Sequence, residues 1–448
     1  MSSLTYQDFE LLNYVNSRVA VRLRAIKQGQ VIILELPVTD LLKASVVGCL
    51  NLLAISDTGE GKSQLLRDIS RNYFGGDGPG GNSNLAEGNS DFDIADLFEF
   101  TDADLSSGRF DSRTARKVDE DRIRRLFNGV DELNRAPTFV QNRFYSFAEG
   151  DYTFRGVKSA LGAQGYSLFW ATMNLNGDFL GTSDTDRALL NRAHIILDLD
   201  HFDSTCHDEI TLERRSKVSP RMDLAPLRDI SDKILEAHAK VSQMASTFDP
   251  YFLAFRLLIG KNGLGYCAKD PYHKKNGRFP MLCSDCDSPS KDLCSRIKSC
   301  SPRTVTAVKK LAYSLAYIVQ LKYGPDVDVD IFSAALQALR FTTYHGNLNE
   351  LIAQDSYSGR KQTMMDETAS LLEPILTDLR DLYLPNIQNG IDPRFLVFDG
   401  NKIVQDTPQL RTILDQSNVP YVLHDLKEDL EAKGLGSDWV DEFVKEIK

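Results

Sequence analysis

The sequence predicts an α/β core, in which helices cover a parallel sheet, followed by a mainly helical region and a small α+β segment. Two observations carry this prediction. Between residues 31 and 200, short β-branched and aliphatic runs alternate with amphipathic stretches, as in β-α-β units. One such run, at 45–56, leads through a glycine turn into an amphipathic stretch at 64–74, which is the order strand, loop, helix.

The elements are expected in the following order. Residues 1–30 are expected to be helical, because apolar residues recur there near helical spacing. Strand-like runs follow at 31–38 and 45–56, and the glycine-, serine- and asparagine-rich stretch 75–90 is expected to be a surface loop. The remaining expected elements of the core are a strand at 125–130, a short helix, a hairpin at 151–165, a strand at 167–174, a helix at 184–192 and a strand at 194–200.

The 448 residues are enough for two or three domains. We expect four parts: an N-terminal helical lead-in (1–30), the α/β core (31–224), a helical region (225–350) that contains a cysteine-rich insertion (261–303), and a C-terminal α+β extension (351–448).

Charge and composition exclude some classes of protein. The chain has 63 acidic and 52 basic side chains, a net charge of -11, so a chain-wide basic surface for nucleic acid is excluded. No signal peptide and no apolar run long enough for a membrane span are evident, so a cytoplasmic protein with no membrane partner is expected. In that reducing compartment, clustered cysteines favour a metal over disulfides.

Residues 56–63 read Ser-Asp-Thr-Gly-Glu-Gly-Lys-Ser, which departs from the P-loop pattern only where Ser56 replaces the first glycine. Glycines let backbone N–H groups approach phosphate oxygens. Lys62 would pair with the β- and γ-phosphates, and the Ser63 hydroxyl would bind Mg²⁺. The other expected loop residues are Asp57, Thr58, Gly59, Glu60 and Gly61. The alternative is a chance glycine turn.

Three further polar residues follow apolar runs. Asp131 and Glu132 come about 70 residues after Lys62; Asp131 would orient Mg²⁺ and Glu132 would act as general base. Asn174 ends the run SLFWATMN, where it would position the attacking water. The alternative for the acidic pair is a strand end that enters solvent, and for Asn174 a turn asparagine.

Four stretches in this order resemble the MoxR family of AAA+ ATPases, within the group that carries a helix-2 insertion. They are DELNRAPTFVQNRFYSFAEGDYTFRG, ATMNLNGDF, TDRALLNRAHIILDLD and SPRT. The resemblance covers roughly residues 45–345, and DELNRAP is its most specific part. The sequence departs from the family pattern at Ser56, Asn191 and Ala193.

The resemblance implies ATP and Mg²⁺ as ligands and gives Lys62, Ser63, Asp131, Glu132 and Asn174 the roles above. It also implies Arg303 as sensor 2, in a helical lid over the nucleotide. Arg192 is the first candidate for an arginine finger that reaches a neighbouring subunit, and Arg187 is the second. The alternative for both is a surface or salt-bridged arginine.

Five of the seven cysteines fall in one short stretch: Cys267, Cys283, Cys286, Cys294 and Cys300. Cys283, Cys286, Cys294 and Cys300 fit a tetrahedral structural Zn²⁺ site, with Cys267 or His273 as a spare or alternative ligand. A 4Fe-4S cluster and free or redox-active thiols are the alternatives. The stretch is basic, with 11 Lys and Arg against 4 Asp and Glu in 261–310. These charges either offset a Zn²⁺ tetrathiolate or form a patch for an acidic partner or nucleic acid.

The resemblance implies a ring, most often a hexamer, that remodels or activates a client protein together with a von Willebrand factor A-type partner. The alternatives are a nucleic-acid-associated motor and a nucleotide-binding scaffold whose ATPase has decayed.

Overall fold

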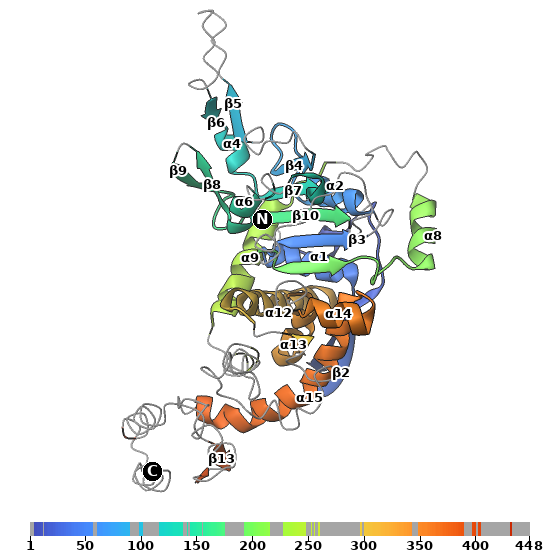
Figure 1. Ribbon diagram of the computed structural model, residues 1–448, viewed down its shortest axis with the longest axis vertical. Helices are drawn as coiled ribbons and strands as arrows, with labels where there is room; N and C mark the ends of the chain where they lie inside the picture. Colours follow the sequence, from blue (N-terminus) through green and yellow to red (C-terminus); the bar gives the residue numbers. More distant parts are fainter. Residues whose placement is uncertain are drawn as a thin grey trace, which may run out of the picture. The chain divides into compact units, whose positions relative to one another are not determined.

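A computed structural model describes the chain in segments (Figure 1). The described residues are 4–11, 13–56, 61–89, 98–101, 116–137, 141, 144–154, 156–174, 192–215, 227–247, 252, 255, 259, 296–297, 300–342, 348–388, 397–399, 402–404 and 431. The chain divides into two compact units, Met1–Ser246 with Lys310–Gln337 and Thr247–Lys309 with Ala338–Lys448. The domain boundaries at 31, 225 and 351 stay predictions.

The first unit is built on a parallel sheet of five strands in the order β11-β3-β10-β7-β4, which confirms the α/β fold class. The strands are β3 (Leu52–Ser56), β4 (Ser83–Glu87), β7 (Phe127–Asp131), β10 (Leu168–Asn174) and β11 (Ile195–Asp198). Because all five run in one direction, their carboxyl ends form one edge of the sheet. Residues far apart in the sequence meet there.

Two helices, α2 (Lys62–Tyr73) and α6 (Phe144–Glu149), pack against this sheet (Figure 1). The other helices described between residues 38 and 246 are α1 (Val38–Val47), α4 (Glu120–Ile123), α8 (Cys206–Arg215) and α9 (Ser231–Ser246). Two neighbouring residues of β10 show that both faces are buried. The Phe169 ring lies 5.9 Å from the ring of Phe147 on α6, and Trp170 contacts Phe127, which stacks at 5.4 Å on Phe74. Successive side chains of a strand point to opposite faces, so this pair anchors β10 from both sides.

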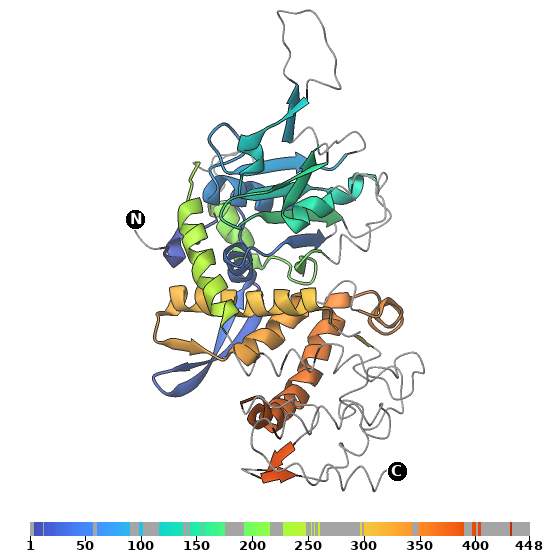
Figure 2. The same cartoon turned by 90° about the vertical axis from the view of Figure 1, so that its left-hand side faces the viewer.

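The prediction of a helix over residues 1–30 is wrong. Within this range lie a short 3-10 helix, η1 (Tyr6–Phe9), and the strand β1 (Val19–Lys27), which pairs with β2 (Gln30–Pro37) and β12 (Val327–Val329) (Figure 2). Along β1, buried Val21, Leu23 and Ala25 alternate with exposed Arg22 and Arg24. This period of two outweighs the apparent helical spacing. Gln28 and Gly29, both at positive φ, form the two-residue turn of the hairpin.

Other parts of the prediction are corrected or confirmed. The stretch 75–90 was expected to be a loop but holds β4, and the run 45–56 begins inside α1 before it becomes β3. The predicted hairpin is confirmed as β8 (Asp151–Phe154) and β9 (Val157–Ala160). A second pair, β5 (Glu99–Thr101) with β6 (Arg116–Val118), precedes it, and η2 (Leu133–Arg135) follows β7. The predicted helix at 184–192 lies outside the described residues, apart from Arg192.

The described part of the second unit is mostly helical, as predicted. Its elements are the start of α12 (Pro302–Tyr323), the end of α13 (Ile331–Thr342), α14 (Glu350–Tyr357), α15 (Lys361–Gln388) and the hairpin of β13 (Val397–Asp399) with β14 (Lys402–Val404). The ion pair between Arg340 and Asp366, at 2.8 Å, joins α13 to α15. Among the described helices, none is long and apolar enough to cross a membrane.

A buried charge cluster ties the N-terminal segment to the helices of the first unit. Asp40, in the first turn of α1, is fully buried. It accepts hydrogen bonds from Tyr6 Oη at 2.5 Å, Lys43 Nζ at 3.0 Å and Lys322 Nζ at 2.7 Å. Burial by itself would raise the pKa of Asp40, but Lys43 and the hydrogen bonds from Lys322 and Tyr6 outweigh it and lower the pKa below its ordinary value.

We expect Asp40→Asn to lower the free energy of unfolding by about 3 kcal/mol at pH 7, because two lysines lose their buried counter-charge. The pKa of Asp40 is lower in the folded protein than its unfolded value of about 3.9. The carboxylate therefore stabilises the folded state fully above about pH 3.9, and this stabilisation is lost as the pH falls through the lower, folded pKa. The difference between the two proteins should therefore shrink below about pH 4. Urea unfolding at several pH values measures both effects.

Glu35→Gln is the matched control, since Glu35 makes an exposed ion pair with Arg22. Such pairs contribute only about 0.2–1 kcal/mol. Equal losses in the two variants would contradict the role given to Asp40.

Candidate functional site

The turn into α2 carries the described part of the predicted phosphate loop. Gly61 precedes the helix with φ 72°, a left-handed conformation that favours glycine, and a Cβ there would lie 3.6 Å from the Tyr14 ring. Lys62 and Ser63 open the helix, whose N-terminal N–H groups suit an anion. Asp57, Thr58, Gly59 and Glu60 lie outside the described residues.

Lys62 is buried at the edge of the sheet and is held by oxygens of two strands. Its Nζ donates to the Ser56 main-chain oxygen at 2.7 Å, to Ser56 Oγ at 2.8 Å and to Asn174 Oδ1 at 2.8 Å. The parallel register of β3 and β10 places Ser56 directly beside Asn174, which explains the shared partner. The structure therefore brings together Lys62 and Asn174, which the sequence separates by 112 positions.

The acidic pair lies at the end of β7 and is organised by a residue that the sequence analysis missed. Thr172 Oγ1 donates to Asp131 Oδ1 at 2.5 Å and accepts from the Glu132 backbone N–H at 2.8 Å. Glu132 has φ 50° and ψ 46°, so the chain turns sharply here. Its carboxylate pairs with Arg135 at 3.0 Å. The one signal for Thr172 is its position two residues before Asn174 on the same strand.

Asn134 links this turn to β10. Its Nδ2 donates to the Asn174 main-chain oxygen at 2.9 Å, and its Oδ1 accepts from the Asn174 backbone N–H at 3.4 Å. Both asparagines are buried. The backbone of Asn174 is thus held from the β7 side, while its side chain faces Lys62.

The donor set at this edge fits a magnesium ion. Mg²⁺ prefers oxygen ligands, and Ser63 and Asp131 supply a hydroxyl and a carboxylate. Thr172 holds one oxygen of Asp131. The magnesium role of Ser63 and Asp131 stays a prediction.

Arg192 makes an intramolecular contact. Its Nε donates to Glu149 Oε1, at the end of α6, at 2.8 Å, and its side chain is about a quarter exposed (23%). This ion pair corresponds to the alternative to an arginine finger, namely a salt-bridged arginine. Arg187 lies outside the described residues, so the finger assignment stays a prediction.

Arg303 and the cysteine cluster belong to the second unit. Arg303 is exposed in the first turn of α12, where the Thr304 backbone N–H donates to Ser301 Oγ at 3.1 Å. Cys300 is a buried free thiol, and burial raises its pKa to about 12. The other predicted ligands, Cys267, Cys283, Cys286 and Cys294, lie outside the described residues. Within the described segments, no group of three or more His, Cys, Asp or Glu could hold a metal.

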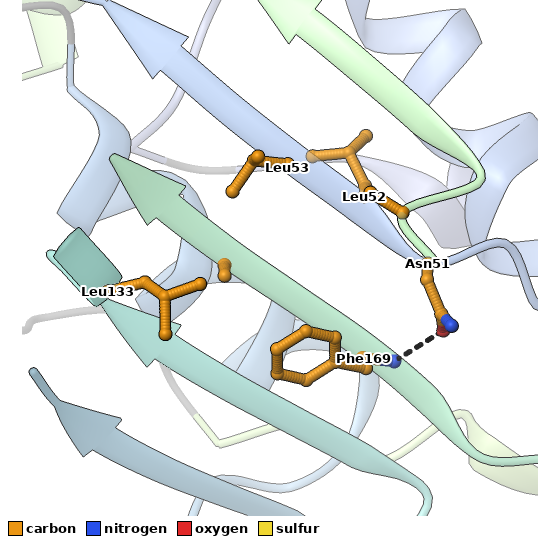
Figure 3. A pocket seen from close by; sticks show the side chains of 7 residues that line it. Asn51, Leu52, Leu53, Leu133 and Phe169 are labelled. Atoms are coloured by element: carbon orange, nitrogen blue, oxygen red, sulfur yellow. Dashed lines mark hydrogen bonds between the residues drawn. The ribbon is translucent and has the colours of Figure 1, made fainter. Parts of the chain in front are cut away.

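A small apolar pocket lies beside β3 and β10 (Figure 3). Its lining residues are Asn51, Leu52, Leu53, Leu133, Phe169, Ala171 and Ala193. Asn51 Oδ1 accepts from the Phe169 backbone N–H at 3.2 Å. Ala193 contributes only a small side chain to this lining. Of the predicted catalytic residues that the structure describes, none is among these lining residues.

Comparison with known proteins supports the fold. No family model and no curated protein matches the chain. Among solved structures, it is similar to a protein of Cytophaga hutchinsonii described as a candidate ATPase. The two share 13% identity over 73% of this chain and 87% of that chain, with a TM-score of 0.50. At this identity the similarity shows the fold alone, an α/β core built on a parallel sheet.

Proposed function

We propose that the protein is a Mg²⁺-dependent AAA+ ATPase of the MoxR type. The observation that carries this proposal is the meeting of Lys62, Asn174, Asp131 and Glu132 at one edge of the sheet, next to the N-terminus of α2. Two strands, β7 and β10, and the helix α2 that follows β3 supply these groups. Such a combination is what phosphoryl transfer to water requires: a cation for phosphate, a metal ligand, a base and a polar group for the water.

The residues divide the chemistry between them. The N–H groups of α2 and Lys62 bind the phosphates of ATP. Bound Mg²⁺ would be held by Ser63 and Asp131 and would offset the charge of the phosphate oxygens. Glu132 takes a proton from the attacking water, and Asn174 holds that water near the γ-phosphate. Thr172 keeps Asp131 and Glu132 in place.

The wider role rests on the family resemblance and on charge. We infer a cytoplasmic ring, most often a hexamer, in which Arg192 or Arg187 acts as the finger and Arg303 as sensor 2. The ring would remodel a client protein together with a von Willebrand factor A-type protein. The net charge of -11 supports a protein client over nucleic acid.

We also propose that the cysteine cluster binds a metal, Zn²⁺ or a 4Fe-4S cluster, close to Arg303 in the sequence. Elemental analysis and a visible absorption spectrum of the purified protein distinguish the two. Absence of zinc and iron would contradict the metal site.

Glu132→Gln should bind ATP but hydrolyse it about 10²- to 10⁴-fold more slowly, because the amide cannot accept a proton from water. Steady-state phosphate release and binding of a fluorescent ATP analogue measure the two properties. The matched control is Glu87→Gln, since Glu87 ends β4 at the same edge of the sheet, paired in register with Asp131. Normal turnover by Glu132→Gln would contradict the proposed function.

Lys62→Ala should weaken binding of the same analogue by about 10- to 100-fold, because charge-assisted hydrogen bonds to the phosphates are lost. Lys240→Ala is the control, since Lys240 is an exposed lysine paired with Glu236 on α9. Equal affinities of Lys62→Ala and wild type would place the nucleotide elsewhere.

The trapped ATP state of Glu132→Gln should retain its client in a pull-down, whereas Lys62→Ala should not. Mass spectrometry identifies what is retained. Recovery of nucleic acid in place of protein, together with DNA-stimulated turnover, would contradict the protein client and favour the motor.

A further inference from the structure

Ser56 makes a contact that the P-loop pattern does not provide. The pattern has glycine at this position, which has no side-chain acceptor. Here Ser56 is fully buried, and its hydroxyl lies 2.8 Å from Lys62 Nζ. The main-chain oxygen of Ser56, at 2.7 Å, would remain with any residue at this position. The serine hydroxyl is therefore an additional partner for the lysine.

Contacts with described residues alone already equal the number of N–H donors of the lysine. An ammonium group has three N–H donors, and Nζ has the two Ser56 oxygens and Asn174 Oδ1 within 2.8 Å. All three oxygens belong to the chain itself and are neutral. A phosphate oxygen is a stronger, charged acceptor, but Nζ reaches it only by giving up at least one of these bonds.

We propose that Ser56 is a positioning residue that holds Lys62 back from the phosphates and so sets the affinity for nucleoside di- and triphosphates. This proposal rests on the proposed function and deepens it. The hydroxyl competes with the β- and γ-phosphates for one N–H of Lys62. A serine in place of the glycine thereby weakens nucleotide binding and favours release of the product.

Ser56→Ala removes only the hydroxyl. In the Glu132→Gln background, it should lower the dissociation constant for ATP and ADP about two- to tenfold, which is the contribution of one hydrogen bond. The affinity for AMP should not change, because AMP lacks the phosphates that pair with Lys62. With Glu132 intact, KM for ATP should fall.

Ser45→Ala is the matched control. Ser45 is equally buried, and its Oγ donates to the Leu41 main-chain oxygen within α1. This variant should leave the affinities for ATP, ADP and AMP unchanged. Ser56→Cys is a second variant of nearly the same shape, whose sulfur is a weak acceptor, and it should also bind ATP more tightly.

The outcomes separate the two proposals. Wild-type protein that binds no ATP overturns the proposed function and the role of Ser56 with it. Wild type that binds ATP, with folded Ser56→Ala and Ser56→Cys variants that bind it equally or more weakly, overturns the role of Ser56 alone. Equal increases in the affinities for ATP and AMP also overturn the role of Ser56, because the effect then does not act through Lys62.

Discussion

The position of β10 between β3 and β7 is the constraint on which the candidate site depends. Its register with β3 places Asn174 beside Ser56. Its register with β7 places Ala171 beside Val130, so the residues that follow them, Thr172 and Asp131, are also neighbours. One strand thereby supplies a partner for Lys62 and a partner for the acidic pair. A shift of one residue would turn both side chains to the other face and remove both contacts.

Packing on both faces of the sheet holds this register. Phe169 and Trp170 are buried on opposite sides, and Trp170 Nε1 donates to the Leu50 main-chain oxygen at 3.1 Å. Asn51 adds a bond from its Nδ2 to the Ala148 main-chain oxygen at 2.7 Å, which ties the start of β3 to α6. The polar groups at the carboxyl edge are therefore carried by strands that the core anchors at their other ends.

The sequence predicts the site residues that stand in recognisable motifs. It does not predict the residues that only hold them in place through tertiary contacts. Lys62 stands in a recognisable glycine motif, and Asp131 and Asn174 follow or close apolar runs, so a parallel sheet is expected to bring them to a common edge. Thr172 and Asn134 were missed, because their roles depend on register and on a turn with positive φ. In β4 the buried side chains are polar: Ser83 bonds Ser70 and Asn84 bonds Asn128, so a loop-like composition concealed a strand.

Asp40 and Lys62 show two ways to bury a charge. Asp40 is surrounded by two lysines and a tyrosine hydroxyl, and its lowered pKa records a charge that folding stabilises. The contacts of Lys62 with Ser56 and Asn174 use neutral oxygens, which solvate an ammonium more weakly than a carboxylate or phosphate does. A cation held in this way remains able to exchange its partners for an anion that enters beside α2. Removal of one partner should thus affect ligand affinity at Lys62, whereas loss of the Asp40 carboxylate affects stability.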